Sequence, residues 1–167
     1  MSSTAALELW DTIAHDAIAE SSLWGDALRP EAERELEPVF STLAEERFAL
    51  GLETIYEGYL VHYGTPRLFA AADQDTALLL GDYLYAHGLV RIASFGEVEA
   101  VADLSELISL CSQLRAEDAG GDGALWAAQV ATVAAATNPP TTDLAIFFER
   151  NLAIMFSQEV EESLVVA

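Results

Sequence analysis

The stretch that decides the fold is TALLLGDYLYAHGLVRIA, which occupies residues 76–93. Its apolar residues recur at spacings of three and four, as they do in a helix, and they cover most of its circumference. A helix that is apolar on nearly all sides must be covered by neighbouring elements. Asp73 or Asp75 is placed to begin it, and Phe95-Gly96 interrupts it. The stretch therefore predicts a central, buried helix in an all-α protein.

The helical pattern continues on both sides of this segment. Ser3 or Thr4 is suited to cap a first helix, and Gly120-Gly121 provides a break late in the chain. We expect a bundle of about six to seven helices that forms a single domain over residues 1–167, because no linker is long enough to divide it. The expected helices cover residues 3–21, 30–38, 41–62, 73–94, 97–116, 122–137 and 142–162.

Glycines recur at a fixed spacing in the two central helices. Gly51 and Gly58 are seven residues apart in one helix, and Gly81 and Gly88 are seven apart in the next. A step of seven returns to nearly the same helix face. An interior glycine costs roughly 1 kcal/mol relative to alanine, so four of them need a reason. The pattern indicates either close packing of the two helix backbones or a seam that forms a cavity for a long apolar ligand.

Charge composition excludes several classes of function. The chain has 28 acidic residues and 7 basic ones, all arginine, for a net charge of −21 at pH 7. Nucleic acids and anionic membrane surfaces both require clustered positive side chains, so neither is an expected partner. No segment reads as a signal peptide or a membrane span, and we expect a cytoplasmic protein. The single cysteine, Cys111, lies among leucines and is expected to be a buried thiol.

Asp82 is the most notable ionisable residue, because it interrupts an otherwise apolar helix. A buried carboxylate needs a partner, which Arg91, Arg150 or a backbone amide would supply. We expect Asp82 to be a structural buried acid rather than a catalytic one. Asp11 and His15 stand at helical spacing and are expected to form a local polar pair.

Other polar residues are interpreted as structural. Glu53, Glu57 and His62 lie close together on one predicted helix, but a di-metal bundle would require Glu-x-x-His on two helices. We therefore expect a solvated or helix-pairing role for them, and a satisfied core position for His87. The sequence contains no zinc spacing, phosphate-binding loop or nucleophile–base pattern, so we expect no cofactor and no metal.

Four segments resemble motifs of the trans-prenyl diphosphate synthases. Residues 52–62 are similar to the apolar helix that leads into the first aspartate-rich motif, and residues 64–66 to the Arg-Gly-x-Pro-Thr after it. Residues 76–86 are similar to the Ala-x-Leu-x-Gly-Asp-x-Leu-x-Ala helix, and residues 148–156 to the Gly-x-Asn-Leu-Gly-x-Ala-Phe-Gln run before the second motif. The segments follow the family's order. The resemblance implies a truncated fold of the isoprenoid-synthase type.

The chain departs from that family at both metal motifs. In the family, two Asp-Asp-x-x-Asp motifs hold magnesium ions against an allylic diphosphate. Here His62 is followed directly by Tyr63, and Val160, Glu161 and Leu164 stand where the second set of aspartates belongs. Hard cations require several oxygen ligands that converge on one point. We therefore expect a relative that is not an enzyme.

The basic residues that hold the diphosphates are missing as well. The chain has no lysine, and Arg67 stands alone after the first motif position. Such a relative resembles the small subunit of heterodimeric hexaprenyl or heptaprenyl diphosphate synthases, which make the side chains of quinones such as menaquinone. There the catalytic subunit carries both motifs, and the small subunit pairs with it and influences product length. The resemblance implies an accessory subunit of a heterodimer or heterotetramer, docked through residues 41–62 and 73–94 or their neighbours.

Two other functions are consistent with the sequence. One is a stand-alone homodimer that binds an isoprenoid or another lipid in a glycine-lined cavity. The other is an enzyme that uses Asp73, Asp75 and Glu161 with magnesium.

Overall fold

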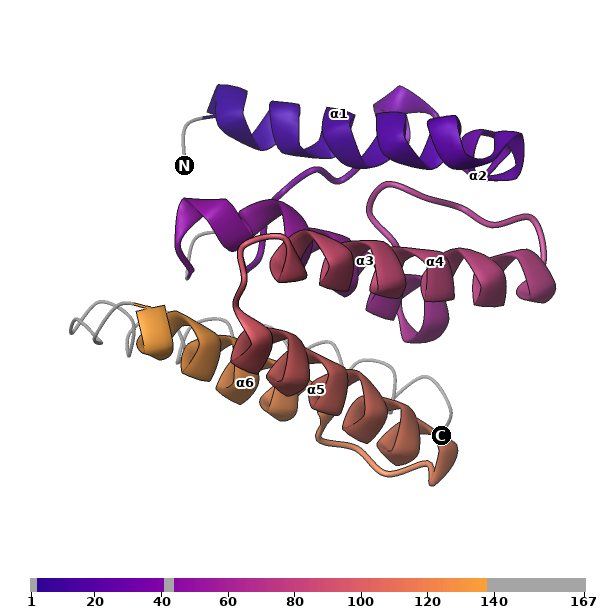
Figure 1. Cartoon of the computed structure of the whole chain (residues 1–167). Coiled ribbons are helices and arrows are strands. Elements are labelled where there is room, and N and C mark those ends of the chain that lie inside the picture. The colour runs from indigo at the N-terminus through magenta and orange to yellow at the C-terminus, as the bar shows by residue number, and fades with distance from the viewer. Residues whose placement is uncertain (1–2, 41–43, 138–167) are drawn as a thin grey trace. The chain divides into compact units, whose positions relative to one another are not determined.

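The computed structural model describes residues 3–40 and 44–137, and their regular structure is helical (Figure 1). This confirms the all-α class. None of these described helices is long and apolar enough to cross a lipid bilayer. The elements are α1 (Ser3–Glu20), α2 (Ser22–Asp26), the 3-10 turn η1 (Glu31–Glu33), α3 (Glu46–Tyr63), α4 (Gln74–Ala93), α5 (Val98–Ala116) and α6 (Asp122–Thr137).

The chain divides into two compact units, Met1–Val101 and Ala102–Ala167. The first unit contains α1 to α4 and the start of α5, and the second contains the rest of α5 and all of α6. We describe each unit by itself. The expectation of one domain over residues 1–167 stays a prediction.

Two segments near the N-terminus differ from the expected helices. No helix was expected between residues 21 and 30, but α2 lies there, and Ser21 caps it by accepting a hydrogen bond from the backbone N of Leu23 at 3.2 Å. Residues 30–38 were expected to be helical but contain only η1. There the backbone forms tertiary hydrogen bonds instead, since Glu35 N donates to the Arg67 carbonyl at 3.2 Å. The expected helix at 142–162 lies outside the described residues.

The core of the first unit lies where α1 and α2 meet α3, α4 and the loop after α3. Leu28 and Phe69 form an isolated antiparallel bridge that ties the segment after α2 to this loop. Not every apolar residue of α1 joins this core, since Leu7 is 51% exposed. The core residues are Leu9, Trp10, Ile13, Ala14, Ala17, Trp24, Ala27, Ala49, Leu68, Phe69, Leu80 and Leu84.

The four glycines lie at the contact between α3 and α4. A Cβ at Gly88 would lie 2.9 Å from the Gly51 carbonyl oxygen, and one at Gly58 would lie 3.0 Å from the Gly81 carbonyl oxygen. Ile55, Ile92 and the His62 ring fill the rest of the seam. These positions have no room for an added methyl group, so the contacts support the packing interpretation and leave no cavity there. α3 and α4 are accordingly side by side in Figure 1.

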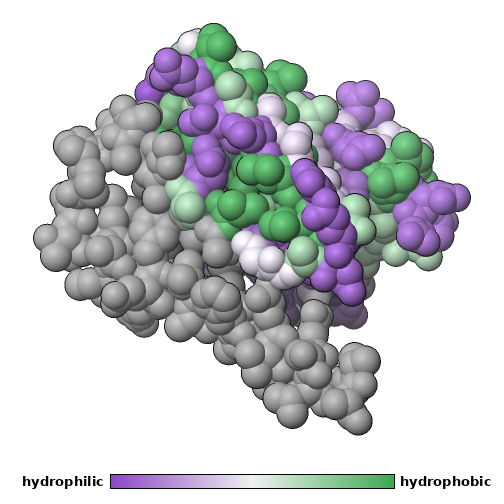
Figure 2. Space-filling model, turned by 90° about the horizontal axis from the view of Figure 1, so that it is seen from below, coloured by the Kyte–Doolittle hydropathy of each residue, from purple (hydrophilic) through white to green (hydrophobic). Residues whose placement is uncertain are grey.

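Only one face of α4 is buried. Leu80, Leu84 and Ile92 are fully buried, but Leu78, Leu79 and Val90 are each more than half exposed. The prediction that this helix is covered on nearly all sides is therefore wrong for the described residues. Its apolar residues exceed what one interface needs. Space-filling atoms show hydrophobic groups among hydrophilic ones on one face of the molecule (Figure 2).

In the second unit, residues 117–121 connect α5 to α6. Arg115 Nε lies 2.6 Å from Asp122 Oδ2, which joins the end of α5 to the start of α6. Gly121 has a φ of 108° and makes the turn possible, because this conformation is strained for residues with a side chain. Among the residues that the structure describes in this unit, the buried apolar ones are Leu104, Leu107, Cys111, Trp126, Val130 and Val133.

Candidate functional site

Two glutamates of α3 are fully buried. Glu53 and Glu57 both have 0% exposure, and they stand one helical turn apart on the same face. Of the two roles expected for them, solvated or helix-pairing, the solvated one is therefore wrong. Ionised carboxylates are rarely buried unless they are paired.

Arg67 is the partner of both glutamates. Its Nη1 lies 2.9 Å from Glu53 Oε2, and its Nε lies 3.1 Å from Glu57 Oε2. The arginine is itself buried, with 7% exposure. We call Glu53, Glu57 and Arg67 the buried ion cluster.

Backbone amides donate hydrogen bonds to the remaining oxygens of the two carboxylates. Glu53 Oε1 accepts a hydrogen bond from Phe40 N at 2.6 Å, and Glu57 Oε1 accepts one from Leu68 N at 2.8 Å. Arg67 Nη1 also donates to the Glu37 carbonyl at 3.1 Å. The cluster therefore fastens two irregular segments, residues 37–40 and 67–69, to α3.

Aromatic rings cover the guanidinium group. Its central carbon lies 4.5 Å from the ring centroid of Trp10 and 4.9 Å from that of Tyr56. Such rings attract a cation through their electron-rich faces and exclude water from it. Arg67 is thus held by α1, α3 and its own loop. All four carboxylate oxygens of the cluster accept hydrogen bonds, which favours an anchoring role over a metal-binding one.

Asp82 is exposed, which corrects the prediction of a structural buried acid. Its side chain is 67% exposed and lies 3.3 Å from His62 Nε2. It lies on the uncovered face of α4, where a carboxylate keeps its hydration. Arg91, one of its expected partners, instead contacts Asp16 and Thr54. Arg150, another of the expected partners, is outside the described residues.

The His62 side chain is the more covered member of this pair, with 8% exposure. Desolvation lowers the pKa of its imidazole below the ordinary value of 6.5, and the Asp82 carboxylate partly opposes that change. The ring stacks on Tyr85 with centroids 5.1 Å apart. His62 therefore serves as a packed aromatic residue in the α3–α4 seam.

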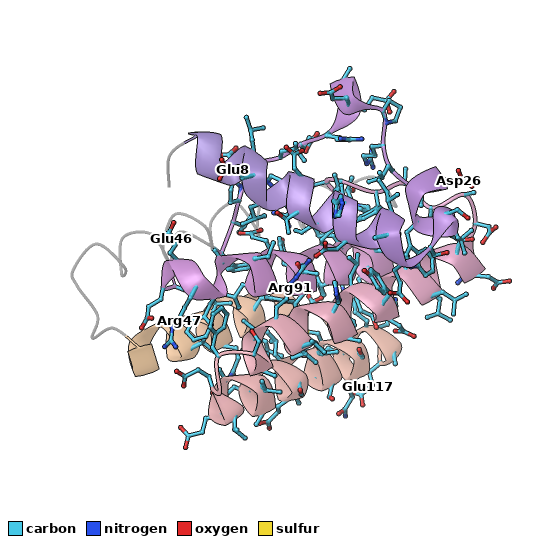
Figure 3. The ribbon with its side chains drawn as sticks, turned by 45° about the horizontal axis from the view of Figure 1, so that its top comes forward. Glu8, Asp26, Glu46, Arg47, Arg91 and Glu117 are labelled. Carbon is cyan, nitrogen blue, oxygen red and sulfur yellow. The ribbon has the colours of Figure 1, made fainter. Side chains whose placement is uncertain are left out.

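Arg91 links α4 to α1. Its Nη2 lies 2.6 Å from Asp16 Oδ2 and its Nη1 donates to the Thr54 hydroxyl, so one guanidinium bridges three helices. Figure 3 shows the labelled Arg91 side chain between the helices of this unit. The pairing lowers the Asp16 pKa, although partial burial of the carboxyl opposes it.

The remaining polar predictions have mixed outcomes. His15 lies 3.4 Å from Asp16 rather than beside Asp11. His87 is half-buried rather than in the core, and its Nδ1 is 3.3 Å from the Tyr83 hydroxyl. Cys111 is buried as expected, and desolvation raises its pKa to about 12.

The acids proposed for a magnesium enzyme do not form a described cluster. Asp73 caps α4 by accepting a hydrogen bond from Thr76 N at 2.7 Å, and Glu161 lies outside the described residues. Within residues 3–40 and 44–137, no three His, Cys, Asp or Glu side chains are grouped so that they could hold a metal ion.

The chain matches no protein-family model, no curated protein and no solved structure.

The ion cluster is what sequence interpretation missed. Glu53 and Glu57 are flanked by Leu52, Thr54, Ile55 and Tyr56, so acids at helical spacing stand within an apolar run. That pattern was a signal for buried acids. It did not identify Arg67 as their partner, because the arginine reaches them through a loop.

Proposed function

We propose that this chain is a non-catalytic accessory subunit of a polyprenyl diphosphate synthase, which pairs with a catalytic subunit and influences product chain length. The ordered resemblance of residues 52–62, 64–66, 76–86 and 148–156 to the family's motifs supports it. The loss of both aspartate-rich motifs favours an accessory role over an enzymatic one. We expect the product of the complex to be a polyprenyl diphosphate that supplies the side chain of a quinone such as menaquinone.

One observation supports the proposal that the subunit is non-catalytic: Arg67 is paired with two glutamates inside the protein. A diphosphate has to be held by accessible positive charge. Arg67 is the basic residue that follows the first motif position, and it is buried against Glu53 and Glu57. The positive charge of Arg67 is used in ion pairs inside the protein. The negative charges of Glu53 and Glu57 are used in the same ion pairs.

Co-expression with the catalytic polyprenyl synthase encoded in the same genome tests the proposal. We expect a stable complex by size-exclusion chromatography with light scattering, and a product length that differs from that of the catalytic subunit alone. The isolated chain should not condense isopentenyl and farnesyl diphosphates in the presence of magnesium. An absent complex together with an unchanged product profile would refute the accessory role, and turnover by the isolated chain would refute the non-catalytic one.

A further inference from the structure

The exposed side of α4 carries an apolar stripe. Leu79 and Val90 are 56% and 63% exposed and stand eleven residues apart, which places them on one helix face. Ala86 is exposed between them, and Leu78 adds a further side chain that is 55% exposed. We define the outer face of α4 as Leu78, Leu79, Asp82, Ala86 and Val90.

This stripe differs from the scattered apolar residues found on most protein surfaces. On α1, Leu7 and Ile18 are exposed to a similar degree and at the same spacing. Exposed Asp11 and His15 lie between them, so α1 has no continuous stripe. On α4 a single acid interrupts the apolar row.

The charge around the outer face is negative. Asp75 and Asp82 lie one turn before and one turn after Leu78 and Leu79, on the same side of the helix. The only arginine of α4, Arg91, is held by α1 and α3. Each arginine in the described residues donates to an acceptor of its own chain: Arg29, Arg34, Arg47, Arg67, Arg91 and Arg115.

These features define the chemistry of an occupant. An apolar row needs apolar side chains opposite it, and the flanking carboxylates favour positive charge at the rim. A second copy of this chain would present the same acids and a net charge of −21 against another −21. A basic partner is therefore favoured over self-association.

We propose that the outer face of α4 docks an amphipathic helix of a partner, with apolar residues at its centre and Arg or Lys at its edges. The inference rests on the proposed function, because the catalytic synthase subunit is the partner that it names. It narrows the docking region expected from the sequence, since α3 is buried over most of its length and α4 is not.

A matched pair of variants tests the surface. Leu79→Glu/Val90→Glu adds two charges to α4, and Leu7→Glu/Ile18→Glu adds two charges at equal spacing and similar exposure on α1. Circular dichroism and thermal melting establish that both variants fold. We expect the α4 variant to weaken binding to the catalytic subunit about tenfold or more, and the α1 variant to leave it within about twofold. A complex that forms with equal affinity for both variants overturns the surface and leaves the accessory function standing.

A second probe tests the surface without the synthase. It is a synthetic helix with leucine at every third or fourth position and arginine at its edges, compared with the same helix carrying glutamate. We expect only the arginine helix to bind, with a loss of about tenfold in Leu79→Glu/Val90→Glu and in Asp75→Arg. Binding should persist in Leu7→Glu/Ile18→Glu and in Asp11→Arg.

The two probes separate the possible failures. If the synthase does not bind and the arginine helix binds at α4, the proposed function fails and the docking chemistry holds. If the arginine helix binds all variants alike, or if light scattering shows a dimer that Leu79→Glu/Val90→Glu dissolves, the proposed occupant is wrong.

Discussion

Glu53, Glu57 and Arg67 place three full charges inside the first unit, and the stability of each depends on the others. Removing one partner from a buried ion pair leaves an uncompensated charge, which typically costs about 3–5 kcal/mol. Arg67→Met preserves much of the side-chain volume but leaves two carboxylates one turn apart. We expect it to lower the free energy of unfolding by about 3–5 kcal/mol in urea titrations.

Two further variants separate the cluster from a general effect of losing an arginine. Arg47→Met removes an exposed arginine that pairs with Glu45 and Glu97, and it should have a far smaller effect. Glu57→Gln retains an acceptor for Leu68 N, so the double variant with Arg67→Met should lose less than the sum of the single losses. Additive losses would show that Arg67 and Glu57 do not interact.

His62 makes the stability sensitive to mild acid. Its pKa in the folded state is lowered below the unfolded value of 6.5 by desolvation, so the unfolded chain takes up the proton first. The contribution of His62 to stability is therefore present above pH 6.5 and falls as the pH drops below it. Burial lowers the pKa of His87 as well, which adds to the same trend.

The variant Asp82→Asn tests how the neighbouring carboxylate affects the pKa of His62. The Asp82 carboxylate raises the His62 pKa, so its removal should lower that pKa further. Titration of the imidazole by NMR checks this, with Asp75→Asn as the control that leaves the pKa unchanged. A His62 pKa at or above 6.5 in the unmodified chain would contradict the burial argument. Asp16 and Asp73 have lowered pKa values, so their contribution to stability is lost only as the pH falls below 3.8. That range is separate from the one in which His62 acts.

At the scale of elements, the α3–α4 pair depends on glycine for its close approach. A methyl group at Gly88 would lie 2.5 Å from Ile55 Cγ1 and 2.9 Å from the Gly51 carbonyl oxygen, and the backbone cannot yield cheaply. Alanine gains about 1 kcal/mol of helix propensity, but overpacking costs about 1–3 kcal/mol or more. With the propensity gain subtracted, we expect Gly88→Ala to destabilise the protein by up to about 2 kcal/mol in thermal or urea unfolding.

Gly25→Ala is the matched control, because it is another helical glycine of the same unit. Its Cβ would lie 3.5 Å from Ile18 Cγ1, an ordinary contact. This substitution should be neutral or stabilising by up to about 1 kcal/mol. If the two alanine variants had equal stability, the backbone contact between α3 and α4 would not be as close as described.

At the scale of the whole molecule, the net charge of −21 opposes the folded state. The compact state brings acids closer together than the unfolded chain does, and salt screens their repulsion, with a Debye length of about 10 Å at 0.1 M and about 3 Å at 1 M. We expect the melting temperature to rise as sodium chloride increases from about 0.05 M to 1 M. A flat or falling melting temperature would mean that the attractive arginine pairs outweigh the acid excess.

The sequence by itself determined the helical class and several element limits. Local signals carried these: Asp73 caps α4, and the sixth helix covers 122–137 as expected. The glycine spacing placed a special seam on these two helices but left close packing and a cavity as alternatives, and the contacts of the structure favour packing. Helical periodicity and capping are local properties, so no tertiary information was needed.

Only the tertiary structure decided where the charges go. Asp82 interrupts an apolar helix yet is exposed, and Glu53 and Glu57 are buried although a solvated role was one of the two expected for them. Their burial depends on Arg67, which a loop of the chain carries back to α3. The free-energy cost of burying a carboxylate depends on a partner that is distant in sequence. The hydrophobic periodicity of a helix does not indicate which residue that partner is.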